Sequence, residues 1–202
     1  MARDRSTRPE AKPVRLFVAV EVPGAAKRIA EAAVAPIREG FPRARWAPPE
    51  NWHVTLKFLG TTYPRLVGWV RETVARVAAG HEPVPTHLTG LGSFPSPGRT
   101  RVLWVGLDDA DGRLAAIVAD LEEAFAPRFR PEGRAFTPHL TVARSDPPLR
   151  IEPEMLATAV DAPGFTIDRL VLFRSYLRRP APRYEALETY PLGGASEGSS
   201  DR

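Results

Sequence analysis

Two stretches of the chain decide its fold: N-W-H-V-T-L-K-F-L-G at residues 51–60 and F-T-P-H-L-T-V-A-R at residues 136–144. Both are rich in β-branched and aromatic residues, which is typical of strands. Each carries a histidine, His53 or His139, followed two positions later by a threonine. Similar strand-forming segments in both halves of the chain predict that the fold contains an internal repeat.

The segments on either side follow the same order in each half. Val18 precedes His53 by 35 residues, and Val105 precedes His139 by 34. Hydrophobic periodicity predicts the order strand, helix, strand, helix, strand in each half. The expected elements of the first half are a strand at 15–22, a helix at 25–38, a strand at 52–59, a helix at 66–79 and an extended segment at 84–94. Those of the second are strands at 102–107, 136–143, 165–173 and 183–187, with helices at 111–125 and near 154–160.

This pattern predicts an α+β fold of two pseudo-symmetric lobes. Each lobe is expected to be an antiparallel sheet with helices packed outside, with the active-site cleft between the lobes. Residues 14–192 are expected to form a single bilobal domain, with lobes at about 14–100 and 101–192 and an exchange of strands left open. Residues 1–13, a basic segment, and residues 193–202 contain few apolar side chains, so both are expected to be disordered tails.

Composition narrows the class of protein. The chain of 202 residues is 43% hydrophobic and 26% charged, which is typical of a globular protein. It has no cysteine, which excludes disulfides, zinc–thiolate sites and thiol nucleophiles. No uncharged apolar run approaches the ~18 residues of a membrane span. Glu21 ends the first apolar run too early for a signal peptide, so we expect a cytoplasmic protein without a membrane partner.

The net charge of +4 comes almost entirely from arginine, with lysine only at positions 12, 27 and 57. Arginine suits phosphate recognition because its planar fork matches phosphate oxygens. A GC-rich genome raises arginine content as well. The charge therefore permits a nucleic-acid or phosphate ligand without requiring one.

The paired histidines suggest acid–base chemistry on a phosphodiester. Side chains at positions i and i+2 of a strand share a face, so His53 and Thr55 point together, with Lys57 beyond them, and His139 pairs with Thr141. If the lobes pack face to face, two imidazoles and two hydroxyls meet. One imidazole can deprotonate the nucleophile while the other protonates the leaving oxygen, and the hydroxyls can donate to non-bridging oxygens. The other histidines, His81 and His87, lack such a counterpart and are expected in loops or on the surface.

The duplicated motif, H-V-T-L at 53–56 and H-L-T-V at 139–142, resembles the signature of the two-histidine phosphoesterases. Three longer segments narrow the resemblance to the LigT-like RNA 2′,3′-cyclic phosphodiesterases, also called 2′-5′ RNA ligases. These segments are R-L-F-V-A-V at 15–20, P-P-E-N-W-H-V-T-L-K-F-L-G at 48–60, and F-T-P-H-L-T-V-A-R at 136–144. The likeness covers about residues 14–190.

This resemblance implies hydrolysis of an RNA terminal 2′,3′-cyclic phosphate to a 2′-phosphate, without a metal or other cofactor. It implies that His53 donates a proton to the departing 3′ oxygen and that His139 activates water. Thr55 and Thr141 would hold the phosphate. Arg144 would meet the phosphate or nucleotide, although strand alternation places it off the His139 face, so that it must reach in from the strand end.

Further substrate contacts are expected from one cation and one aromatic ring. Lys57 shares the predicted face of His53, unless it is only a solvated cation at the strand end. Phe17 is a candidate to stack on the terminal base, as are Trp46 and Phe94, because every base offers a π-face. Two aromatic residues in central strand runs are expected to pack in the core instead: Trp104 and Phe173.

Other functions remain open on the sequence. The same residues could act on a 2′-5′-linked oligonucleotide or a small cyclic phosphate, or could run the reaction backwards as ligation. A non-catalytic module that binds RNA ends, including tRNA fragments, also fits the positive charge. A metallohydrolase does not fit, because two histidines supply too few ligands and neither motif contains an acidic residue. The expected oligomeric state is a monomer.

Overall fold

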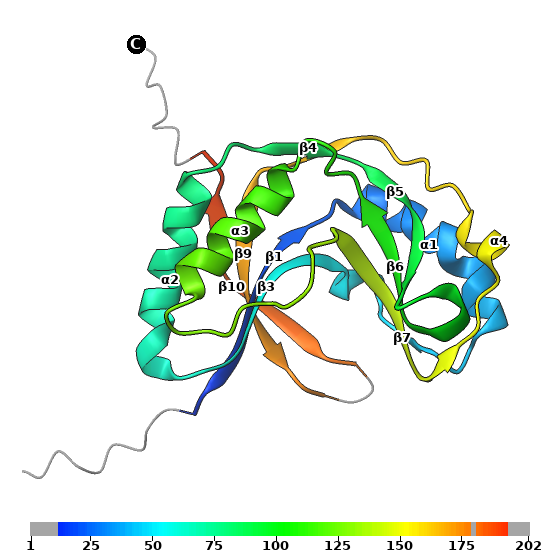
Figure 1. Ribbon diagram of the computed structural model, residues 1–202, viewed down its shortest axis with the longest axis horizontal. Helices are drawn as coiled ribbons and strands as arrows, with labels where there is room; N and C mark the ends of the chain where they lie inside the picture. The colour runs from blue at the N-terminus through cyan, green and yellow to red at the C-terminus, as the bar shows by residue number, and fades with distance from the viewer. Residues whose placement is uncertain (1–11, 179–180, 194–202) are drawn as a thin grey trace, which may run out of the picture.

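One antiparallel sheet runs through the molecule and takes strands from both sequence repeats (Figure 1). The structure, a computed structural model, describes residues 12–178 and 181–193. The sheet has eight strands in the order β10-β9-β1-β3-β7-β6-β5, with the short β2 paired to β7, and β4 pairs separately with β8. The strands of the first repeat are β1 (Val14–Glu21), β2 (Arg45–Trp46), β3 (His53–Thr62), β4 (Val84–Thr86) and β5 (Leu88–Phe94). Those of the second repeat are β6 (Thr100–Leu107), β7 (His139–Leu149), β8 (Phe165–Ile167), β9 (Arg169–Tyr176) and β10 (Arg183–Pro191).

The predicted α+β class with antiparallel pairing is confirmed, but the repeats do not form two separate sheets. One long strand of each repeat pairs with the first strand of the other repeat: β5 pairs with β6, and β9 pairs with β1. The short strands β4 and β8, which precede β5 and β9, pair with each other. This exchange gives β1 and β6 a partner on both sides, which removes two open edges that would otherwise expose unpaired backbone groups.

The two halves of the sheet meet at a single register pair. Val54 of β3 lies opposite Leu140 of β7, and both side chains are fully buried. We call Val54 and Leu140 the seam pair. Because each follows a motif histidine by one residue, the seam fixes where the two motifs face each other.

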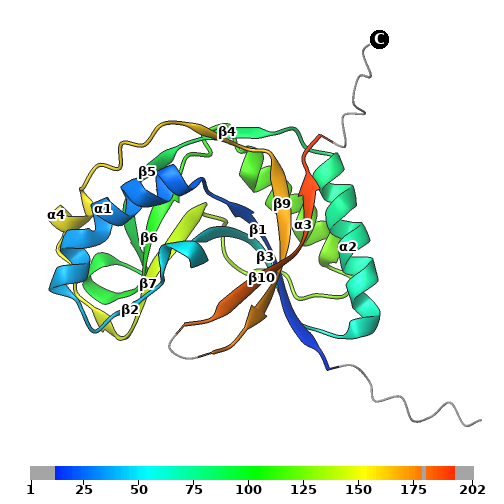
Figure 2. The same cartoon turned by 180° about the vertical axis from the view of Figure 1, so that it is seen from behind.

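The long helices cover one side of the sheet. These helices are α1 (Gly24–Gly40), α2 (Pro64–Ala79) and α3 (Arg113–Phe125), with a short α4 at Pro153–Leu156 and a 3-10 turn at Pro49–Asn51. Their buried residues recur at helical spacing, as Ala26, Ala30 and Val34 do in α1. Helices α2 and α3 pack over β3, β9 and β10, whereas α1 packs against β5 (Figures 1 and 2). No described helix is long and apolar enough to cross a membrane.

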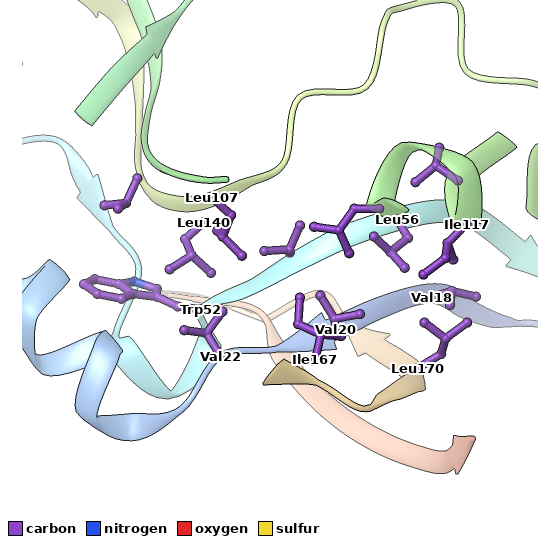
Figure 3. Packing of buried hydrophobic residues seen from close by; sticks show 14 of the residues in the cluster. Val18, Val20, Val22, Trp52, Leu56, Leu107, Ile117, Leu140, Ile167 and Leu170 are labelled. Carbon is purple, nitrogen blue, oxygen red and sulfur yellow. The ribbon is translucent and has the colours of Figure 1, made fainter. Parts of the chain in front are cut away.

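The main hydrophobic core lies between this layer of helices and the sheet. Val18 of β1, Leu56 of β3 and Ile117 of α3 gather there together with the seam residue Leu140 (Figure 3). A smaller cluster, centred on Phe17, occupies the opposite side of the sheet, which carries no helix of the described chain. The predicted tails fall almost entirely on residues 1–11 and 194–202, which lie outside the described part of the chain.

Candidate active site

Each motif histidine begins its strand, and a backbone carbonyl fixes its ring. Nδ1 of His53 lies 2.8 Å from the carbonyl oxygen of Asn51, and Nδ1 of His139 lies 2.6 Å from that of Thr137. A carbonyl can only accept, so Nδ1 carries the proton in both rings. Nε2 of each imidazole is therefore the nitrogen left to accept or deliver a proton.

The seam pair brings both motifs to one side of the sheet. In an antiparallel pair, the residues before and after an inward-pointing pair point to the opposite face. His53 and Thr55 flank the seam on β3, as His139 and Thr141 do on β7. All four side chains are half-buried on the face without helices. The juxtaposition of two imidazoles and two hydroxyls therefore follows from the backbone pairing.

A β-bulge at Leu56 moves Lys57 away from this face. Two consecutive residues of β1 lie opposite Thr55 and Lys57, so Leu56 between them has no partner, and the alternation of side chains reverses beyond it. The Lys57 side chain is 1% exposed; its Nζ lies 2.7 Å from Oε2 of Glu122 and donates to the carbonyl of Arg130 at 2.9 Å. The prediction that Lys57 binds substrate beside the first histidine is wrong, because simple alternation does not anticipate the bulge.

A matching β-bulge in β7 brings Arg144 onto the face of the histidines. Two consecutive residues of β6 lie opposite Thr141 and Ala143, which leaves Val142 unpaired. Val142 and Ala143 are both buried, and Arg144 is exposed. Its positive charge lowers the pKa of both motif histidines, so it lies close to them. The prediction that strand alternation places Arg144 off this face is therefore wrong, because the bulge at Val142 reverses the alternation.

Phe58 is a site residue that the sequence reasoning missed. It follows His53 by five residues, as Arg144 follows His139, and the two strands carry matching bulges in between. Phe58 is 51% exposed and lies on the face of the first histidine, 5.9 Å from the Phe17 ring. Alignment of the segments H-V-T-L-K-F at 53–58 and H-L-T-V-A-R at 139–144 would have revealed that Phe58 and Arg144 are equivalent.

An aromatic cluster surrounds the first histidine. The ring of His53 lies 4.8 Å from Phe17, 5.8 Å from Phe173 and 5.0 Å, edge-on, from Tyr184. Phe17 is only 1% exposed, so it has no free face for a base, and the prediction that it stacks on substrate is corrected: it supports the imidazole instead. Phe173 packs in this cluster, as expected. Tyr184 was not anticipated, because its strand, β10, lies far along the chain.

A different aromatic pair flanks the second histidine. The His139 ring lies 5.2 Å from Phe94, edge-on, and 6.0 Å from Trp104. Gly92 lies opposite Trp104, and a Cβ at Gly92 would overlap the indole ring, so this position needs glycine. Phe94 thus lies beside the site, as the stacking prediction requires. Trp46 does not, because its indole donates to a backbone carbonyl at the end of α1 on the helical side.

Burial and nearby cations disfavour protonation of both imidazoles. Desolvation by burial lowers the pKa of His53 to about 4, and the charges of Lys27, Arg144 and His139 act in the same direction. Burial, followed by the charge of Arg144, also lowers the pKa of His139. The carbonyls that accept from Nδ1 oppose these shifts. At neutral pH, without a bound anion, both Nε2 atoms therefore present lone pairs.

The remaining histidines take no part in this site. His87 is exposed, and Nε2 of His81 lies 2.8 Å from Asp120, with which it forms an exposed pair. Within residues 12–178 and 181–193, no three histidine, cysteine or acidic side chains come together as a set that could hold a metal ion. The groups that converge on the histidine face are two imidazoles, two hydroxyls and one guanidinium.

Known proteins are similar to this chain in sequence and in fold. Residues 23–178 match the family model of the 2′-5′ RNA ligase superfamily. The chain is 34% identical over 191 residues to the RNA 2′,3′-cyclic phosphodiesterase of Thermus thermophilus, with 90% of this chain and 91% of the relative covered. It is 31% identical over 185 residues to that of Geobacillus stearothermophilus, covering 90% of this chain but only 58% of the relative.

Among solved structures, the crystal structure of the Thermus thermophilus protein TT0787 superimposes with a TM-score of 0.74 at 27% identity. The match covers 90% of this chain and 99% of that one. The family match therefore extends beyond the two short motifs to nearly the whole described fold. With its paired histidine strands and exchanged sheet, the chain belongs to the 2′-5′ RNA ligase superfamily.

Proposed function

We propose that this protein hydrolyses the 2′,3′-cyclic phosphate at an RNA end to a 2′-phosphate by paired-histidine acid–base catalysis. The observation that carries the proposal is the matched fixation of the two imidazoles. Each holds its Nδ1 proton against a carbonyl two residues earlier, which leaves Nε2 for proton transfer, and the two imidazoles lie on the same face of the sheet. The names of the relatives supply the substrate, an RNA end that carries a cyclic phosphate.

The two histidines take complementary roles in the proposed reaction. His139 Nε2 removes a proton from water, whose oxygen attacks phosphorus. The bond from phosphorus to the 3′ oxygen breaks, and His53 Nε2–H delivers its proton to that oxygen. The products are a 2′-phosphate and a 3′-hydroxyl, so one proton enters and one leaves the histidine pair in each turnover. This division of roles follows the family resemblance, and the geometry is compatible with it.

Phosphate binding favours protonation of the imidazole that acts as the acid. In the free protein both imidazoles resist protonation, chiefly because they are buried. A phosphodiester anion beside them favours the charged form, which raises the pKa of the proton donor towards neutrality. Thr55 and Thr141 can donate hydroxyl hydrogen bonds to the non-bridging oxygens. Arg144 can neutralise charge that develops on them in the transition state.

The base of the terminal nucleotide has two exposed partners. Phe58 and Arg144 occupy equivalent positions on β3 and β7, and both side chains are exposed on the histidine face. An aromatic face and a guanidinium plane both stack on nucleobases without sequence preference. We therefore assign base contact to Phe58 and Arg144, in place of the buried Phe17.

The decisive experiment incubates the protein, in chelator, with a short RNA ending in a 2′,3′-cyclic phosphate. The expected product is a monoester that resists a phosphatase specific for 3′-phosphates. His139→Ala should slow its formation by at least ~10², and His87→Ala is the matched control, because the exposed His87 is also followed two positions later by a threonine, Thr89. A 3′-phosphate product, equal rates for the two variants, or no turnover by the wild type would each overturn the proposal. Incubation of a cyclic-phosphate end with a 5′-hydroxyl end measures joining at the same site, in which the 5′ oxygen replaces water as the nucleophile and the 3′ oxygen leaves as before.

A further inference from the structure

A second arginine lies beside Arg144 at the edge of the histidine face. Arg45 of β2 is directly opposite Arg144 of β7, and the next pair in register is Trp46 with Ala143 (Figure 2). Trp46 and Ala143 pack with the main core on the helical side. Because neighbouring residues of a strand point to opposite faces, the side chains of Arg45 and Arg144 both point to the face of the motif histidines. We call Arg45 and Arg144 the arginine pair.

No carboxylate of the described chain neutralises the arginine pair. Both side chains are exposed, and neither has an acidic group within ion-pair distance among residues 12–178 and 181–193. Asp146, the acidic residue of β7, forms an ion pair with Arg101 instead, at 2.8 Å. On its other side, Arg144 lies opposite the uncharged Val102 of β6. Two unneutralised guanidinium groups therefore lie on adjacent strands of one face.

The arginine pair is unfavourable while no anion is bound. Side chains directly opposite each other on antiparallel strands have Cβ atoms about 4.5–5.5 Å apart, and like charges at such positions repel. The register is fixed, because Ala47, two residues after Arg45, donates its backbone N–H to the carbonyl of Val142 at 2.8 Å. An anion bound between the two guanidinium groups would replace this repulsion by attraction.

The arginine pair lies beside the place where the reacting phosphate binds in the proposed reaction. Burial lowers the pKa of both motif histidines and the charge of Arg144 adds to this effect, so Arg144 lies close to both rings. Neighbouring strands are only about 4.8 Å apart. The guanidinium of Arg45 can therefore reach the same phosphate as that of Arg144.

We propose that the arginine pair binds the reacting phosphate most tightly when that phosphate carries more than one negative charge. It thereby stabilises the transition state and the 2′-phosphate product more than the singly charged cyclic phosphate. The inference rests on the proposed function and deepens it, since it makes Arg45 a further catalytic residue and names the charge of the phosphate as the property that the site selects. The juxtaposition of two unneutralised arginines on the histidine face carries it.

The charge of the phosphate changes along the proposed reaction. The cyclic diester carries one negative charge, and its oxygens gain more as water gives its proton to His139 and attacks phosphorus. The monoester product carries two negative charges at neutral pH, because its second pKa is about 6. Two planar guanidinium groups match such a dianion with several parallel N–H···O bonds. An interaction that strengthens towards the transition state raises kcat.

A binding experiment without turnover tests the proposal. Isothermal titration calorimetry at about pH 8, above the second pKa of the monoester, measures the affinity for two probes. These are adenosine 2′-phosphate, a dianion, and its methyl phosphodiester, a monoanion. The test variant is Arg45→Gln, and Arg45→Lys restores the charge without the planar fork. Arg76→Gln is the matched control, because Arg76 of α2 is also exposed and has no acidic group of the described chain within ion-pair distance.

We expect the wild type to bind the monoester more tightly than the methyl ester. Arg45→Gln should bind the monoester about tenfold more weakly, since a hydrogen bond between charged groups is lost, and the methyl ester almost as well as the wild type does. Arg45→Lys should fall between the two, and Arg76→Gln should equal the wild type. In hydrolysis of the cyclic phosphate, Arg45→Gln should lower kcat about tenfold with little change in KM, as expected when an interaction is made only in the transition state.

Unfolding in urea separates this role from a structural one. Arg45→Gln removes the repulsion with Arg144, so the midpoint of unfolding of the free protein should stay unchanged or rise. Replacement of a residue that stabilises the fold would lower the midpoint and weaken the binding of both probes alike.

Three results would overturn the proposal: an unchanged affinity of Arg45→Gln for the monoester, equal losses for the two probes or in Arg76→Gln, or no preference of the wild type for the monoester. The two proposals fail separately. If the wild type does not open the cyclic phosphate, the proposed reaction is wrong, yet the titrations still decide whether the arginine pair selects a dianion.

Discussion

The two halves of the site have the same backbone and different side chains. Both strands run histidine, buried residue, threonine, bulge, and both bulges leave two buried residues in succession before an exposed one. At the first position after the bulge, β3 has Lys57 where β7 has Ala143. At the next position, β3 has Phe58 where β7 has Arg144. The shared backbone determines where each group points, whereas the substituted residues determine its chemistry.

This difference makes the two histidines unequal. His53 lies within a cluster of aromatic rings that includes one from the additional strand β10. The aromatic rings beside His139, within the described part of the chain, are those of Phe94 and Trp104, on a half-sheet that ends at β5. Acid–base catalysis on one phosphate requires one proton donor and one acceptor. The unequal surroundings of the two imidazoles are therefore useful, and each prediction below tests one difference or one similarity.

The largest expected effect tests the similarity of the halves. We expect His53→Ala and His139→Ala each to lower kcat by at least ~10², the usual contribution of a general acid or base. The double variant should lose little more than either single variant, because the pair acts as a unit. Steady-state hydrolysis of a cyclic-phosphate RNA measures all three. Losses that multiply in the double variant would mean that the histidines act independently.

The next effect contrasts Lys57 with its counterpart Ala143. Lys57→Met leaves the Glu122 carboxylate without its cation, and we expect it to lower the free energy of unfolding by about 3 kcal/mol, as breaking a buried ion pair does. Adding Glu122→Leu removes the stranded charge and should restore much of that loss. Urea unfolding of both variants measures the difference. If Lys57→Met is neutral while activity falls, the correction that places Lys57 outside the site fails.

Much of the fold was predictable because it depends on local patterns. Helices expected at 25–38, 66–79 and 111–125 occur as α1, α2 and α3, within a few residues of those bounds. The runs of β-branched and aromatic residues, together with the spacing of the repeat, identified the strands that carry the two motifs, β3 and β7. The pairing between repeats was not predictable, because the crossover of β5 and β9 depends on contacts between segments distant in sequence.

In the site, the sequence pointed to His53 and His139 because strand alternation places a histidine and the threonine two residues later on the same face. Beyond the threonine the prediction failed in both strands, since a bulge is a property of two paired strands and leaves no local signal in either one. An unrecognised bulge in each strand explains the misplacement of Lys57 in β3 and of Arg144 in β7. Tyr184 could not be found from the motifs, because its strand reaches His53 only through tertiary pairing.

The third effect contrasts Arg144 with Phe58 through pH dependence. The productive form of the free protein carries one proton on the histidine pair, so kcat/KM should peak between the two pKa values. One of these is about 4, and the other lies below the ordinary value of 6.5. Arg144→Gln removes a cation that opposes protonation of both rings, so the whole profile should move to higher pH. The peak should also fall about tenfold, since a hydrogen bond to a charged group is lost.

Phe58→Ala is the matched comparison, because it removes an uncharged side chain from the equivalent position. Phe58→Ala should weaken substrate binding and leave both the acidic and the alkaline limb of the pH profile of kcat/KM at their wild-type positions. Initial-rate profiles of kcat/KM against pH for the two variants decide the matter. A profile that stays in place in Arg144→Gln would show that its guanidinium does not face the histidines.

The smallest effect contrasts the residues that hold the two rings. Asn51 and Thr137 both accept from Nδ1 through the backbone, but Asn51 also donates from its side chain to the carbonyl of Pro182, just before β10. Asn51→Ala keeps the backbone carbonyl that accepts from His53 but loses the side-chain hydrogen bond to Pro182. We expect kcat to fall roughly fivefold, well below the ~10² that a 1 Å misplacement of reacting groups can cost. Thr137→Ala, which removes no side-chain bond recorded in the structure, should be close to wild type.

The pH profile separates positioning of the ring from general weakening of the fold. The Asn51 carbonyl raises the pKa of His53, so a looser bond should let that pKa fall further and shift the acidic limb of kcat/KM to lower pH. The limb that belongs to His139 should not move. A uniform loss of rate at every pH, matched by a loss of unfolding free energy, would reduce Asn51 to a structural residue. A shifted acidic limb at wild-type stability would mean that the hydrogen bond from Asn51 to Pro182 helps to set the protonation of His53.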